Sequence, residues 1–114
     1  MTPPAVHEVF SALADPTRRA VVELLRQKPL RAGELADTLG MSAAALSRHL
    51  RVLRRNGLIV DDAIDEDARV RLYRLEPTAF VSMRDWLTEL ESFWSDQLGA
   101  FSAHVEGTRK RVRR

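Results

Sequence analysis

The segment from Arg31 to Leu58 constrains the fold of this chain more than any other. Apolar residues at helical spacing predict one helix over residues 32–39 and a second over residues 42–56. Gly40 suits a left-handed helix end, and Ser42, two residues later, is a natural N-cap for the next helix. Two helices joined by about three residues that include glycine form a helix-turn-helix. The sequence therefore predicts this motif within a chain of 114 residues, which has room for one domain.

The remaining segments predict helices before this motif, a hairpin after it and a long helix at the end. Asp15 and Pro16 are a favourable cap and first residue for the second helix, which Pro29 stops. The expected elements are helices at 5–13, 16–28, 32–39 and 42–56, strands at 58–62 and 70–75, and a helix from 77 to about 105. The fold class is thus mainly α with a small β-hairpin. Residues 1–4 are expected to form a flexible start, 5–106 the domain and 107–114 a basic, disordered tail.

Composition and charge exclude several classes of protein. The chain has no cysteine, which excludes a disulfide framework and a thiolate metal site. No apolar run reaches the roughly 18 residues of a membrane span, and the first ten residues lack the pattern of a signal peptide. We therefore expect a cytoplasmic protein without a membrane partner. The net charge is +2, but five of the last six residues are basic, so the rest of the chain is slightly acidic.

The sequence does not predict an enzyme, a cofactor or a metal. The only histidines are His7, His49 and His104, and none is paired with a nucleophile on one predicted face. There is no glycine-rich phosphate loop. His104 stands alone among carboxylates in the last helix, which is more typical of a surface residue than of a metal ligand.

The helix predicted at 42–56 has one face with small residues at its start and arginines beyond. No acidic residue occurs between Thr38 and Val60. Small residues at a helix start allow it to enter the major groove of DNA, and arginines reach phosphates or guanine edges. The alternative is that this face of the helix is simply exposed to solvent and binds nothing. The glycine turn, the small residues and the missing acids favour double-stranded DNA as the partner. The candidate contacts on this helix are Ser42, Ala43, Ala44, Ser47, Arg48, Arg51 and Arg54.

Three further candidates for DNA contact have two readings each. His49 lies toward the core side of its helix, where a bond to the backbone is as expected as a phosphate contact. Arg69 and Arg71 alternate along the second strand and either reach DNA or balance the five acids between residues 61 and 67. Phosphates repel such acids, so contact by the hairpin tip itself is not expected.

The last helix carries apolar residues at spacings of four and three, close to a heptad pattern. This seam is either monomer core or a dimer interface, and its tryptophans could instead line a ligand pocket. Such a small domain cannot absorb so much apolar surface, so we favour the interface. A two-fold dimer would present two reading helices about 34 Å apart, one turn of duplex. The predicted interface residues are Val6, Val9, Phe10, Leu87, Leu90, Trp94, Leu98 and Phe101.

Several strings resemble the ArsR family of bacterial transcriptional regulators. They are ALADPTRRAVVELL, LRAGELADTLGMSAAALSRHLRVLRRNGLIV and RLYRLEP, within a match that covers roughly residues 8–105. The resemblance implies a winged helix-turn-helix with recognition helix 42–56 and wing 58–75. It also implies a homodimer formed by the first and last helices, a palindromic operator, and repression relieved by a signal.

The chain departs from the metal-sensing members of that family. These members typically carry Cys-x-Cys where this chain has Arg31-Ala32-Gly33, so the resemblance implies the metal-free branch and leaves the small-molecule effector unknown. The expected function is a sequence-specific DNA-binding transcriptional regulator and dimeric repressor. The alternative is a winged-helix module that binds protein, which the acidic wing slightly supports.

Overall fold

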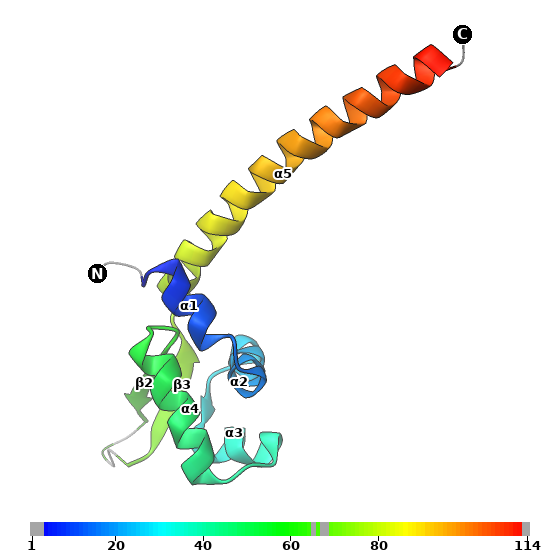
Figure 1. Ribbon diagram of the computed structural model, residues 1–114. Coiled ribbons are helices and arrows are strands. Elements are labelled where there is room, and N and C mark those ends of the chain that lie inside the picture. Colours follow the sequence, from blue (N-terminus) through cyan, green and yellow to red (C-terminus); the bar gives the residue numbers. More distant parts are fainter. Residues whose placement is uncertain (1–3, 65, 67–68, 113–114) are drawn as a thin grey trace. The chain divides into compact units, whose positions relative to one another are not determined.

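The elements follow the chain in the predicted order, with one additional short strand. The structure is a computed structural model that describes residues 4–64, 66 and 69–112 (Figure 1). The prediction of a mainly helical chain is confirmed. The elements are α1 (Val6–Ala12), α2 (Pro16–Gln27), β1 (Leu30–Arg31), α3 (Ala32–Leu39), α4 (Ala43–Arg55), β2 (Ile59–Ala63), β3 (Arg71–Leu75) and α5 (Pro77–Val112).

The predicted caps delimit the helices of the helix-turn-helix and the helix before it. The Asp15 carboxylate accepts a hydrogen bond from the Arg18 amide at 3.0 Å, and Pro16 is the first residue of α2. Gly40 ends α3 with φ of 63°, a left-handed conformation that glycine adopts without strain. The Ser42 hydroxyl accepts from the Ala45 amide at 3.1 Å and begins α4. Local chemistry therefore sets the turn between α3 and α4.

The sheet has three strands in the order β1-β3-β2, all antiparallel. The hairpin of β2 and β3 was predicted, and its register pairs Ile59 with Leu75 and Asp61 with Tyr73. β1 was not predicted. It is only two residues long and pairs Leu30 with Tyr73 across the chain. A two-residue strand shows no alternation of its own, so only the tertiary pairing defines it.

The core lies where α1, α2, α3, α4 and the sheet meet. Its largest fully buried side chains are Val9, Val21, Leu35, Leu46, Leu53, Leu58 and Ile59. The prediction that Val9 lies at a dimer interface is therefore wrong, because its side chain has no exposed surface. In the short helix α1, Val9 and Ala12 share the buried face, whereas Phe10 lies on the other side and is 37% exposed.

Parts of both predicted flexible segments lie within the described residues. Pro4, expected in a flexible start, accepts a hydrogen bond on its carbonyl oxygen from the Ser82 hydroxyl at 2.7 Å. Helix α5 continues to Val112, so its predicted end near Val105 was too early. Residues 107–112 belong to this helix in the structure. The remaining predicted flexible residues, 1–3 and 113–114, lie outside the described residues.

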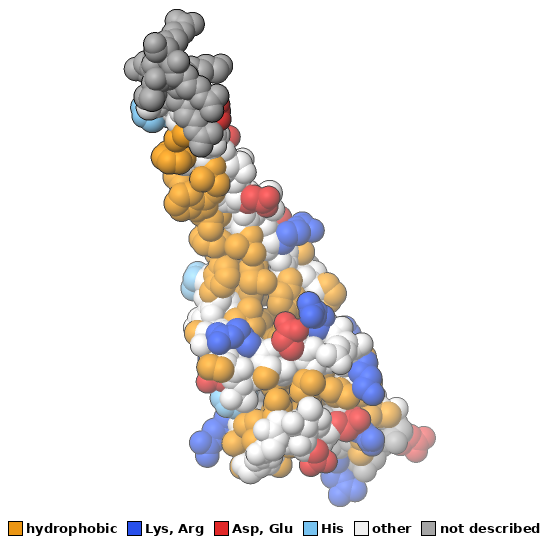
Figure 2. All heavy atoms as spheres, turned by 90° about the vertical axis from the view of Figure 1, so that its right-hand side faces the viewer, with side chains coloured by type: hydrophobic (Ala, Val, Ile, Leu, Met, Phe, Trp, Pro, Cys, Tyr) orange, Lys and Arg blue, Asp and Glu red, His pale blue; other side chains and the backbone are white. Residues whose placement is uncertain are grey.

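The chain forms two compact units, residues up to Met83 and residues from Arg84 onward, where we predicted one domain. In the first unit, Phe80 and Met83 from the start of α5 pack against the core. The second unit is the rest of α5, whose apolar side chains form a band visible in Figure 2. Every helix in the described residues is too short or too polar for a membrane span.

Candidate nucleic-acid interface

Helix α4 separates its apolar and polar residues onto opposite faces. Leu46, Leu50 and Leu53 are buried in the core at spacings of four and three residues. The opposite face of the helix, with its N-cap residue, carries the candidate DNA contacts. They are all exposed: Ser42, Ala43, Ala44, Ser47, Arg48, Arg51 and Arg54. We call these seven residues the exposed face of α4.

Much of the positive charge on this helix is available to a ligand. Arg48, Arg51 and Arg55 make no ion pair within the part of the chain that the structure describes. The helix contains no acidic residue, and its N-terminus adds a partial positive charge. These three arginines can therefore attract a polyanion without first giving up an ion pair. Arg55 was not among the predicted contacts.

Arg54 and Arg71 converge on one carboxylate, that of Asp61 in β2. Arg54 Nη1 donates to Asp61 Oδ1 at 3.2 Å, and Arg71 Nε donates to Asp61 Oδ2 at 2.9 Å. Arg71 Nη2 also donates to the Asp61 backbone oxygen at 3.1 Å. The Asp61 side chain is only 10% exposed, whereas those of Arg54 and Arg71 are 57% and 37% exposed. Asp61 thus joins α4 to both β2 and β3.

The electrostatics of this cluster keep Asp61 ionised. Burial alone would raise the pKa of its carboxyl, but hydrogen bonds from Arg71 and Arg54, together with their charges, hold that pKa below the ordinary value. Opposite it, burial and the Asp61 charge raise the pKa of the Tyr73 phenol. Tyr73 therefore remains a neutral hydrogen-bond donor at neutral pH.

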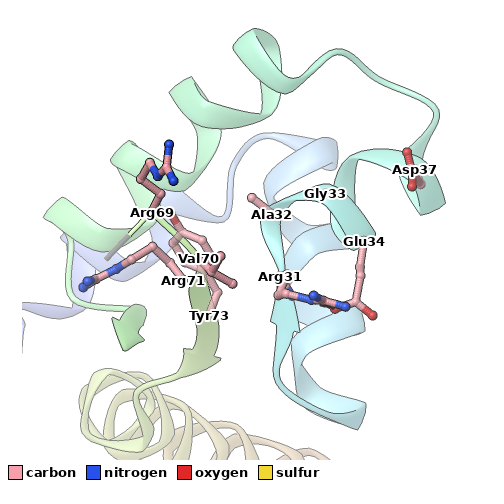
Figure 3. Close-up of a pocket in the computed structure, with 9 residues that line it drawn as sticks. All are labelled: Arg31, Ala32, Gly33, Glu34, Asp37, Arg69, Val70, Arg71 and Tyr73. Carbon is pink, nitrogen blue, oxygen red and sulfur yellow. Dashed lines mark hydrogen bonds and ion pairs between the residues drawn. The ribbon is translucent and has the colours of Figure 1, made fainter. Parts of the chain in front are cut away.

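Two hollows flank β3, and Tyr73 lines both. The larger, about 450 Å³, lies between the start of α3 and β3, with the Arg31–Glu34 pair and Asp37 on one side and Arg69, Val70, Arg71 and Tyr73 on the other (Figure 3). The smaller, about 140 Å³, lies between α4 and β3 and is lined by Ser47, Leu50, Arg51, Arg54 and Tyr73. The predicted residues Arg69 and Arg71 thus border the larger hollow, and Arg71 is also bound to Asp61.

His49 lies where α4 meets the start of α2. Its Nδ1 is 3.7 Å from Asp15 Oδ2, and the two side chains are 24% and 32% exposed. The pKa of Asp15 is lowered mainly by the hydrogen bond from the Arg18 amide, and further by His49. The neighbour of His49 is therefore the carboxylate that caps α2, and the histidine side chain is partly buried there.

The sequence reasoning missed Tyr73 and Asp61 as parts of this interface. Tyr73 occupies an alternating position with Arg69 and Arg71, so its side of the strand was readable. Asp61 was counted among the acids of the hairpin tip. The register of the sheet places it instead inside the strand pairing, opposite Tyr73. In the described residues, no three His, Asp or Glu side chains are grouped to hold a metal ion.

Comparison with known proteins places this interface in a family. The pattern described as "Bacterial regulatory protein, arsR family" matches residues 15–60, which contain α2, α3 and α4. The chain is 39% identical over 97 residues to the HTH-type transcriptional regulator Rv2034 of Mycobacterium tuberculosis, covering 85% of each protein. It is 29% identical to the transcriptional repressor SdpR of Bacillus subtilis, over 72% of this chain and 88% of SdpR.

A solved structure agrees with these relatives. The crystal structure of the ArsR family transcriptional regulator RHA00566 superposes with a TM-score of 0.68 at 34% identity, over 78% of this chain and 89% of that one. This likeness, together with the family match, confirms the winged helix-turn-helix fold. The chain therefore belongs to the arsR family of bacterial regulatory proteins and is a DNA-binding transcriptional regulator, not an enzyme.

Proposed function

We propose that this chain is a homodimeric repressor that binds a palindromic operator through α4. The observation that carries the proposal is the exposed face of α4, which combines small residues, Ser47 and arginines without any acid. Two of these arginines, Arg48 and Arg51, make no ion pair within the described residues. Because the helix start is narrow, it can approach the bases of the major groove closely. A chromosomal regulator acts where the DNA is, so we expect it in the cytoplasm.

The residues of this face divide into two roles. Ser42, Ala43, Ala44 and Ser47 lie in the first turns, where a recognition helix meets base edges. Arg48 and Arg51 lie further along and reach guanine edges or phosphates. Arg54, Arg69 and Arg71 would face the DNA backbone beside the groove, and His49 supports α4 through Asp15. The first group sets the sequence preference, and the arginines supply most of the affinity.

The apolar band of α5 supports the dimer. Its exposed side chains include Leu87 at 46%, Trp94 at 53%, Leu98 at 59% and Phe101 at 64%. So much exposed apolar surface on one helix is typical of a protein interface. Phe93 and Trp94 also stack edge to face, with ring centroids 5.6 Å apart. We propose that two copies pair through this band, to which Leu90 of α5 also belongs, with Val6 and Phe10 of α1 contributing.

The direction of regulation is proposed from one relative and from the size of the protein. SdpR, which this chain resembles over most of its length, is named a transcriptional repressor. A small dimer bound across an operator excludes polymerase without needing a further domain. We therefore propose repression, with relief by an effector that does not require cysteine ligands.

The test compares single substitutions on a duplex recovered by selection from random DNA. Ser47→Ala should reduce the discrimination between sequences more than it reduces non-specific binding. Arg48→Ala should weaken binding. It should also make the negative slope of log K against log salt less steep, by up to about 0.9, the value for one phosphate. Arg26→Ala on α2, whose guanidinium pairs with Glu23 at 3.0 Å, is the matched control and should change neither.

Two outcomes would contradict the proposal. If Ser47→Ala and Arg48→Ala behave identically, the two roles are wrongly assigned. If the wild-type protein selects no sequence at moderate salt, the winged fold serves protein binding instead, as the acidic wing would then suggest.

A further inference from the structure

The hollow between α4 and β3 is lined almost entirely by hydrogen-bond donors. Ser47 and Tyr73 contribute hydroxyl groups, Arg51 and Arg54 contribute guanidinium groups, and Leu50 is the one apolar residue. No carboxylate lines it among the described residues. At about 140 Å³ the hollow holds several water molecules or one small group. Its chemistry suits an oxyanion with several acceptor oxygens.

Asp61 fixes the orientation of one of these arginines, Arg54. Its carboxylate binds Arg54 and Arg71 at 3.2 Å and 2.9 Å but does not line the hollow. The Arg54 side chain remains 57% exposed, so further N–H groups can donate to a ligand. A guanidinium that is already oriented loses less side-chain entropy on binding. The Asp61 carboxylate can therefore act on a ligand in the hollow only through the arginines.

We propose that this hollow binds one phosphate of the DNA backbone and that Asp61 is the residue that positions Arg54 for it. We call the hollow lined by Ser47, Leu50, Arg51, Arg54 and Tyr73 the phosphate seat. The proposal rests on the proposed function, because α4 in a major groove brings the adjacent backbone to the strand side of the helix. The wing then contributes through β3 at its base, not through its acidic tip.

The seat and simple electrostatics predict opposite effects for Asp61→Asn. Removing an acid from a DNA-binding surface should strengthen binding if only net charge matters. If Asp61 positions Arg54, the same substitution should weaken binding about tenfold, the size of one charge-assisted hydrogen bond. The matched control is Asp62→Asn, which removes the same charge from the next residue and releases Arg74. It should leave affinity unchanged or slightly increased.

A second variant keeps the test valid if Asp61→Asn unfolds. Tyr73→Phe removes one hydroxyl from the seat, alters no charge and preserves the packing of the ring. It should weaken binding several-fold to all sequences alike, with an unchanged salt slope. Thermal unfolding of each variant shows whether the fold is intact at the assay temperature.

A duplex with single methylphosphonate linkages tests the ligand itself, because each linkage removes one phosphate charge. Fluorescence anisotropy measures binding of wild-type protein and Arg54→Ala to each duplex. At one linkage in each half-site, the losses from the linkage and from Arg54→Ala should be non-additive. Additive losses at every linkage, or Asp61→Asn that binds as tightly as Asp62→Asn, would overturn the seat. If wild-type protein instead selects no duplex, it is the proposed function that fails.

Discussion

At the scale of single residues, the turn between α3 and α4 depends on one backbone conformation. Gly40 has φ of 63°, and a Cβ there would meet no atom within 4 Å. Gly33 in α3 has equally open surroundings but a helical backbone. Gly40→Ala should therefore lower the free energy of unfolding by about 1–2 kcal/mol. Gly33→Ala should leave it unchanged or raise it by up to about 1 kcal/mol. Urea unfolding measures both, and equal effects would contradict the account.

The carboxylate of Asp61 also predicts a dependence of stability on pH. Its pKa in the folded protein is lower than its ordinary value of 3.8. The ion pairs therefore stabilise the fold fully above about pH 4–5, and this contribution is lost as pH falls through the lowered pKa. The free energy of unfolding should decrease less steeply below pH 4 in Asp61→Asn than in wild type. Parallel curves from urea titrations at several pH values would contradict this.

Residue-level predictions from sequence succeeded where the cause was local. Asp15, Gly40 and Ser42 were assigned as caps because each acts on the backbone within a few positions. The partners of Arg54 and Arg71 were not predictable, since both reach Asp61 across 7 and 10 positions. Such contacts depend on the register of β2 and β3 and on where α4 docks, which no local pattern encodes.

At the scale of elements, the two faces of α4 should be separable by mutation. Leu53 is fully buried, so Leu53→Ala should cost about 2–5 kcal/mol of stability. Arg48 is exposed and unpaired within the described residues, so Arg48→Ala should leave stability within about 0.5 kcal/mol of wild type while weakening DNA binding. Chemical denaturation and anisotropy measure the two properties. A destabilised Arg48→Ala would show that the face is structural.

The elements also show which helices and strands apolar periodicity can predict. Helices α2, α3 and α4 have strong apolar spacing and matched their predicted bounds within about two residues. Strand β1 is too short to have a period, and the apolar spacing of α1 did not show which of Val9 and Phe10 faces the core. Helix α5 exceeded its predicted length because its apolar pattern ends before the helix does. Where a helix is not buried, its sequence has no apolar pattern, and the length predicted from that pattern is too short.

At the scale of the whole molecule, the apolar band of α5 predicts self-association. Trp94→Glu places a charge in that band and should convert a dimer to monomers of 12.9 kDa in sedimentation. DNA affinity should then fall at least about tenfold, because two linked half-site contacts become independent. Glu91→Gln, at an exposed polar position of the same helix, is the control and should remain dimeric. A wild-type monomer would contradict the interface.

The most direct test of the central claim is selection of bound sequences from random duplex DNA with the wild-type protein. A dimer that reads the major groove with two copies of α4 should enrich an inverted repeat whose half-site centres are about 10 base pairs, or a multiple of that, apart. The Ser47→Ala variant should enrich the same repeat with a weaker preference for its bases. Enrichment of a single half-site, or of no sequence, would contradict the account of this chain as a paired reader of DNA.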